Sequence, residues 1–136
     1  MTFRLVLLAS LTFAACSQPP ATNNAADAPP TPLPCTVEAP TEEWRAAART
    51  WCEGGVFTRV NVSTDDNNFT AVLHFSDQGA ISYSSNRAAL LDNFRRLADE
   101  VSMKTQLNVA FSLHDTAGAI VGACARARAA AGATCK

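Results

Sequence analysis

The segment Ser17–Pro34, SQPPATNNAADAPPTPLP, contains no large apolar residue before Leu33. Such a segment cannot bury enough apolar surface to offset the entropy lost on ordering, and its prolines hold the backbone extended. The composition therefore predicts a disordered Pro/Ala-rich tether over residues 16–34. Folding is then confined to residues 35–136, a length that suits a single domain.

Upstream of the tether, Leu5–Ala15 is an apolar run of eleven residues that follows Arg4. A helix of that length is too short to span roughly 30 Å of hydrocarbon, but it matches the apolar part of a secretory signal. The ending FAAC, Phe13–Cys16, resembles the signal of bacterial lipoproteins, in which small residues precede a lipidated cysteine. Phe13 departs from the leucine that this family prefers. An ordinary secretory cut, after Ala14, is the alternative and leaves a soluble periplasmic protein.

The resemblance implies that residues 1–15 are removed and that fatty acyl chains attach to Cys16. In well-studied bacteria, a serine after the lipidated cysteine, here Ser17, implies transfer to the outer membrane. We therefore expect an outer-membrane lipoprotein whose acyl chains enter the membrane and whose domain lies in the periplasm. Retention at the inner membrane and exposure at the cell surface are the alternatives.

The chain has five cysteines, an odd number that needs explaining in an exported protein. With Cys16 as the acyl carrier, four remain, and an oxidising compartment favours two disulfides among them. We favour the sequence-local pairs Cys35–Cys52 and Cys124–Cys135, and a bridge between the two ends of the domain is the alternative. The sequence has no C-x-x-C pair and no histidine at ligand spacing, so we expect neither a metal site nor a cofactor.

Apolar periodicity predicts the secondary structure of the domain. Thr41 can cap a helix that Gly54 and Gly55 end. Ser84 or Ser85 can cap a second helix, whose apolar stripe reaches Val101. We read SDQG, residues 76–79, as a tight turn. Alternation predicts strands over Val56–Ser63, Phe69–Phe75, 106–113 and 119–125, an optional short strand over Ala80–Tyr83, and a short C-terminal helix within 126–132.

This order, αββ(β)αββ, predicts an α+β fold. The economical packing is a small two-layer sandwich, with a mostly antiparallel sheet of four to five strands and two helices on one face, stapled by disulfides. The order is similar to that of small αββαβ modules of bacterial envelope proteins, such as BON-type and secretin-type domains. That likeness concerns the fold and carries no activity. The sequence identifies no family for the folded domain.

Strand parity predicts a polar sheet face opposite the helices. Both histidines of the chain fall on it, and they titrate near neutrality. An ordinary solvated face is the alternative to a partner surface. The candidate partner-binding residues are Arg59, Asn61, His74, Asn108, Ser112 and His114, and Thr70 and Val72 share their parity.

The charge balance and the absence of catalytic motifs limit the classes of function that the sequence supports. The 11 Lys and Arg nearly balance the 12 Asp and Glu, which argues against nucleic acid as a partner. The chain has no G-x-S-x-G, HExxH or glycine-rich phosphate loop, so we expect no enzyme and name no catalytic residue. The expected function is a non-catalytic binding or accessory lipoprotein for a protein partner or envelope assembly. A periplasmic immunity or inhibitor protein is the alternative, and a small hydrolase using His74 or His114 ranks third.

Overall fold

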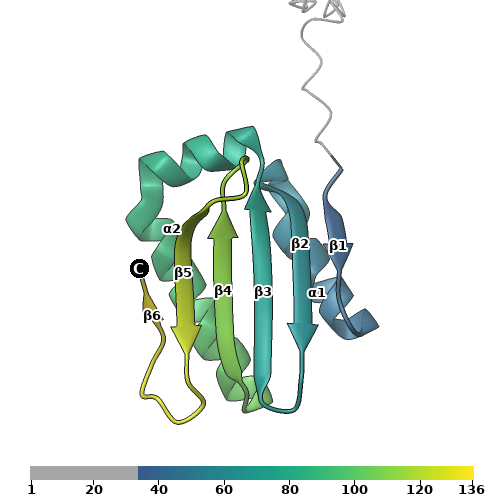
Figure 1. Cartoon of the computed structure of the whole chain (residues 1–136), viewed down its shortest axis with the longest axis vertical. Coiled ribbons are helices and arrows are strands. Elements are labelled where there is room, and N and C mark those ends of the chain that lie inside the picture. The colour runs from purple at the N-terminus through teal and green to yellow at the C-terminus, as the bar shows by residue number, and fades with distance from the viewer. Residues whose placement is uncertain (1–33) are drawn as a thin grey trace, which may run out of the picture. The chain divides into compact units, whose positions relative to one another are not determined.

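A computed structural model describes the fold for residues 34–136, so Cys16, the cleavage site and most of the tether lie outside the described residues. The elements are β1 (Thr36–Glu38), α1 (Glu42–Cys52), the 3-10 turn η2 (Glu53–Gly55), β2 (Phe57–Thr64), β3 (Asn68–Phe75), α2 (Asp77–Thr105), β4 (Asn108–His114), β5 (Ile120–Arg126) and β6 (Thr134–Cys135). They form an α+β domain in which both helices lie on the same side of one sheet (Figure 1).

Helix α1 begins and ends where local signals predict. The Thr41 hydroxyl accepts a hydrogen bond of 3.2 Å from the backbone N–H of Trp44, and Glu42 and Glu43 occupy the first turn, near the positive end of the helix dipole. Gly54, with φ 85°, follows the helix in a conformation that favours glycine. Within residues 34–136, neither helix is long and apolar enough to cross a membrane.

Helix α2 begins earlier than expected. Ser76 is its N-cap, because its hydroxyl accepts a hydrogen bond of 3.0 Å from the N–H of Gly79. The sequence SDQG is therefore a helix start rather than a tight turn, and Ala80–Tyr83 are helical rather than a strand. A break at Asn86 (φ −133°, ψ 33°) separates this first part of α2 from the strongly periodic part that follows, which explains why the sequence pattern marks only the second part.

The sheet has six strands in the order β1-β2-β3-β4-β5-β6, and it is mixed rather than mostly antiparallel. The β2–β3, β4–β5 and β5–β6 pairs are antiparallel, whereas β1–β2 and β3–β4 are parallel. The central pair is parallel because α2 carries the chain back to the end at which β3 began. Strands β1 and β6 were not predicted, because they have three and two residues, too few to show an alternation of apolar and polar side chains.

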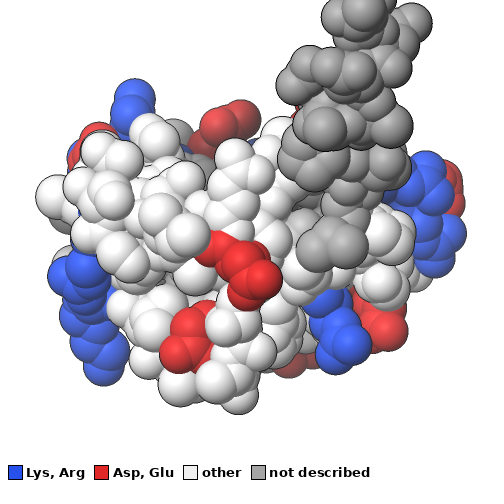
Figure 2. All heavy atoms as spheres, turned by 90° about the horizontal axis from the view of Figure 1, so that it is seen from above, with Lys and Arg blue, Asp and Glu red and all other residues white. Residues whose placement is uncertain are grey.

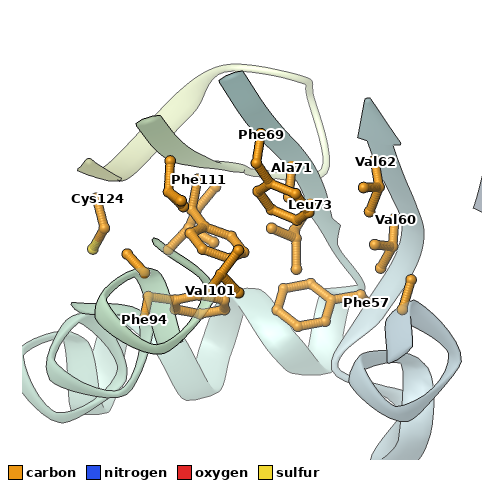
Figure 3. Close-up of a cluster of buried hydrophobic side chains, with 14 of the residues drawn as sticks. Phe57, Val60, Val62, Phe69, Ala71, Leu73, Phe94, Val101, Phe111 and Cys124 are labelled. Atoms are coloured by element: carbon orange, nitrogen blue, oxygen red, sulfur yellow. The ribbon is translucent and has the colours of Figure 1, made fainter. Parts of the chain in front are cut away.

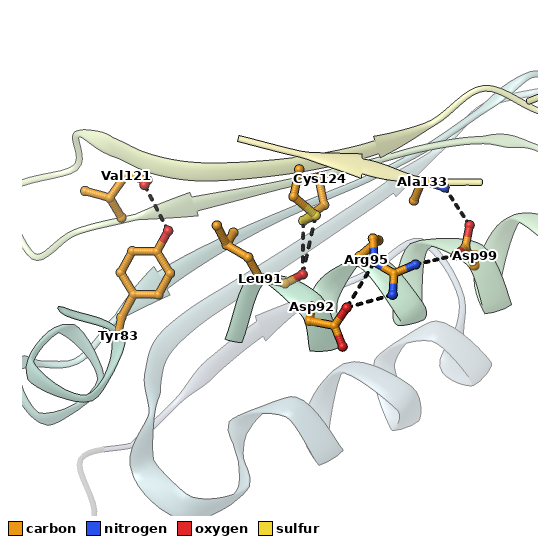
Figure 4. Close-up of a disulfide and its surroundings, with 9 residues drawn as sticks. Tyr83, Leu91, Asp92, Arg95, Asp99, Val121, Cys124 and Ala133 are labelled. Carbon is orange, nitrogen blue, oxygen red and sulfur yellow. Dashed lines mark hydrogen bonds and ion pairs between the residues drawn. A yellow bond between two sulfur atoms is a disulfide. The ribbon is translucent and has the colours of Figure 1, made fainter. Parts of the chain in front are cut away.

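The C-terminal segment was also predicted wrongly. Residues 127–132 form turns and bends rather than a short helix, and they lead into β6. The disulfide Cys124–Cys135 joins β6 to β5, where the two cysteines are also register partners (Figure 4). The second disulfide, Cys35–Cys52, joins the residue before β1 to the end of α1. Both favoured cysteine pairs are thus confirmed.

The core fills the space between the sheet and the two helices (Figure 3). The β2–β3 register shifts between Phe57 and Arg59, which turns the Phe57 side chain into the core although Val60 and Val62 also point inward. The tryptophans of α1 pack on this core: Trp44 lies 4.6 Å from Phe69 between ring centres. The largest fully buried side chains are Phe69, Phe75, Phe111, Leu73, Leu113 and Val60.

Candidate functional site

The side of the sheet that the helices leave uncovered is the candidate site, and we call it the open face (Figure 1). Because side chains alternate along a strand, the residues between the buried positions of β2–β5 point to this side. All six sequence-predicted partner-binding residues occupy such positions. The open face comprises Arg59, Asn61, Thr70, Val72, His74, Asn108, Ala110, Ser112, His114, Ala123 and Ala125.

The middle of the open face carries no charge. Strands β3, β4 and β5 contain no Asp, Glu or Lys, and their one arginine, Arg126, binds Asp99 of α2 on the other side of the sheet. Charged residues gather instead on the surface of α2, which lies on the other side of the sheet. They are Asp92, Arg95, Arg96, Asp99 and Glu100.

The open face has small side chains where the first residues of β4 pair with the last residues of β5. Ala110 and Ala125 are exposed and pair with each other in the β4–β5 ladder. They line a shallow hollow of about 350 Å³ together with Thr70 and Asn108. Sequence analysis missed these two alanines, although their strand parity places them beside Ser112 and Thr70. An alanine side chain has no functional group, so its residue type does not indicate a binding site.

A row of three basic side chains crosses one end of the open face. Arg59 pairs with His74 across β2–β3, and His74 pairs with His114 across β3–β4. The two imidazole ring centres lie 4.8 Å apart, with the ring planes inclined by 40°. Burial lowers the pKa of His74, and electrostatic interactions with the neighbouring His114 and Arg59 lower it further.

Hydrogen bonds fix the orientation of His114. Its Nδ1 lies 3.0 Å from the carbonyl oxygen of Gly118, and its Nε2 lies 3.0 Å from the Ser112 hydroxyl. A carbonyl oxygen only accepts, so Nδ1 carries a proton, and in the neutral ring Nε2 then accepts from Ser112. The Asp115–Gly118 turn after β4 positions this carbonyl, since Gly118 takes φ 86°.

A second hollow, of about 480 Å³, lies beside the histidine row, at the carboxyl end of β3 and β4. Arg59 and His74 line it together with Asp77, at the start of α2, and Asp115, after β4. Figure 2 shows this end of the molecule, where both acidic and basic side chains lie on the surface. The hollow is therefore polar and carries both signs of charge.

The two remaining predicted residues lie apart from the histidine row. The Asn61 amide donates a hydrogen bond of 3.0 Å to Glu38 of β1. The Asn108 amide donates to the side chain of Asn68 and accepts from the backbone N–H of Arg128. Both amides therefore join strands and turns at the border of the open face.

The Ser112–His114 pair has the hydrogen-bond geometry of a nucleophile and its base, which sequence reasoning did not expect from neighbouring positions of one strand. Strand β4 lies between β3 and β5, and its backbone N–H groups serve those two ladders. The backbone N–H groups of β4 are consequently not available to an oxyanion at this pair. In the part of the chain that the structure describes, no three His, Cys, Asp or Glu side chains gather as a metal-ligand set.

Comparison with protein-family models, with curated proteins and with solved structures gives no match. The chemistry and shape of the open face therefore carry the functional argument.

Proposed function

We propose that this protein is a membrane-anchored envelope lipoprotein whose open face binds a protein partner without catalysing a reaction. One observation carries the proposal: the three strands at the middle of the open face are free of charged side chains on that side. The centres of protein interfaces are depleted of charged residues, whereas solvated surfaces are rich in them. The uncharged strands and their polar border match a docking surface of this kind.

The anchor is the second part of the proposal. The FAAC ending at Cys16 and the Pro/Ala-rich segment after it support a lipid-tethered domain on the outer membrane, facing the periplasm. Two disulfides suit such an oxidising compartment. Mass spectrometry of the N-terminal peptide from membranes tests this part. We expect an acylated Cys16 as the first residue, and an unacylated terminus or another start would contradict it.

Charge placed on the open face tests the docking surface. We expect Ala110→Glu and Ala125→Glu each to abolish recovery of the partner after cross-linking in native membranes, because a carboxylate at the centre of an interface is desolvated without compensation. Arg96→Glu, on α2, is the matched control and should leave recovery unchanged. Equal recovery from all three variants would contradict the proposal. A captured toxin or hydrolase that loses activity on binding would identify the module as an inhibitor.

A further inference from the structure

We propose that His74 and His114 together bind a divalent transition-metal ion that prefers imidazole nitrogen, Zn²⁺ or Cu²⁺. The two residues belong to neighbouring parallel strands, β3 and β4, and are direct register partners. The sequence separates them by 39 other residues, and the crossover through α2 brings them together. The inference does not depend on the proposed docking function.

The separation of the two rings fits one shared ion. Zinc binds imidazole nitrogen at about 2.0–2.1 Å, so two imidazoles at a tetrahedral angle place their ring centres roughly 5 Å apart. The observed separation is 4.8 Å. The two rings can thus reach one ion through side-chain rotation alone, since the register already aligns the backbone of their strands.

The hydrogen bond between His114 Nδ1 and the Gly118 carbonyl oxygen is also typical of a histidine that binds a metal. Histidines that bind a metal commonly donate their other ring N–H to a backbone carbonyl or a carboxylate, which fixes the tautomer and orients the ring. His114 Nδ1–H does so here, at 3.0 Å from the carbonyl oxygen of Gly118. The Nε2 lone pair points away from the turn and toward the Ser112 hydroxyl, so it binds an ion only when the Ser112 side chain adopts another rotamer.

His74 supplies the second nitrogen. The hydrogen bond at His74 uses its backbone carbonyl, which accepts from Thr58, and no residue within 34–136 donates to or accepts from its ring nitrogens. A neutral imidazole is the form that binds a metal. His74 lines the polar hollow together with Asp77 and Asp115, and this hollow can admit the water molecules that complete the coordination.

The nearby charges limit the affinity. Arg59, paired with His74 in the β2–β3 ladder, repels a cation, whereas Asp77 and Asp115 at the hollow attract it. With two protein ligands and an adjacent arginine, the site is expected to bind an ion reversibly rather than to hold a permanent structural metal. Imidazole nitrogen suits zinc, copper, nickel and iron, so competition among these ions follows their general order of affinity.

Titration of the full chain in detergent with Zn²⁺, together with electron paramagnetic resonance of the Cu²⁺ form, tests the site. We expect one saturable site in the wild type and a copper spectrum with coupling to two imidazole nitrogens. His74→Gln and His114→Gln should each lose the saturable site, and the double variant measures background binding elsewhere in the chain. Ser112→Ala, which removes the competing hydroxyl, should bind at least as tightly as the wild type.

The proposal fails if either single histidine variant, folded by circular dichroism, keeps the wild-type affinity. It also fails if the wild type binds no more metal than the double variant. Ala110→Glu separates this site from the docking surface, because it should keep metal binding whether or not it loses the partner.

Discussion

The α-carbon of Gly79 packs directly against the backbone carbonyl of Val56, and a Cβ atom added to Gly79 would lie 1.9 Å from that oxygen. The same carbonyl accepts a hydrogen bond of 2.9 Å from the N–H of Ser76, and the Ser76 hydroxyl donates to the carbonyl of Gly55 at 2.5 Å. The start of α2 is thereby fixed to the chain that enters β2. This contact sets the direction of α2, and hence the pairing of β3 with β4.

Substitution of Gly79 tests this contact. We expect Gly79→Ala to lower the free energy of unfolding by about 3 kcal/mol, because the added methyl group meets rigid backbone rather than a flexible side chain. Gly132→Ala is the control: its nearest neighbour would be 3.9 Å away, so its stability should stay near that of the wild type. Urea unfolding followed by tryptophan fluorescence measures both. Equal stability of the two variants would contradict the close contact.

Asp99 holds the C-terminal segment against α2 (Figure 4). Its Oδ1 accepts hydrogen bonds of 2.8 Å from Arg126 and 2.7 Å from the backbone N–H of Ala133. We expect Asp99→Ala to lower the free energy of unfolding by about 2 kcal/mol, because a half-buried guanidinium and a backbone N–H lose their acceptor. Glu100→Ala, the exposed neighbour, should change it little. A loss of the same size in both variants would refute this role.

The Cys124–Cys135 disulfide closes a loop with a sequence separation of 11. Replacing both cysteines with serine should lower the free energy of unfolding by about 3 kcal/mol, since the unfolded chain regains the entropy of the open loop. The strand β6 should also exchange its amide hydrogens faster, because few other bonds hold it. Denaturant titration and hydrogen exchange check the two effects. If the amides of β6 stayed equally protected from exchange, the hydrogen bonds to Asp99 would be enough to hold β6 without the disulfide.

The lowered pKa of His74 predicts a dependence of stability on pH. The folded state binds the His74 proton more weakly than the unfolded state, whose histidine pKa is about 6.5. Stability from this residue is therefore complete above that value and is lost as the pH falls through and below it. His74→Gln should flatten the profile of unfolding free energy between about pH 7 and pH 5.5. Parallel profiles of the variant and the wild type would contradict a lowered pKa of His74 in the folded protein.

Local signals predicted much of the fold. The cap at Thr41, the apolar alternation in β3 and the spacing of the cysteines each act over a few residues, so the sequence displays them directly. The parallel pairing of β3 with β4 depends on where α2 begins, and the Ser76 cap and the break at Asn86 conceal that start. The expected antiparallel arrangement was wrong for this reason.

The sequence also predicted only those features of the candidate site that depend on a local pattern. Strand parity predicted that His74, Ser112 and His114 share a face, because alternation is local. It gave no information on which strands are neighbours, so the contact between the two histidines could not be predicted. Ala110 and Ala125 have no functional group, so the sequence provided no reason to select them, although strand parity places them on the open face.

Site-specific photo-cross-linking tests the central proposal, that the open face binds a protein partner, most directly. A photoreactive residue is placed at Ala110, at Ala125 or, as a control, at Arg96 on α2, and native membranes are irradiated. We predict one discrete cross-linked product, containing the same second protein, from both open-face positions and none of that mass from position 96. The same product from all three positions, or none from the open face, would contradict the account.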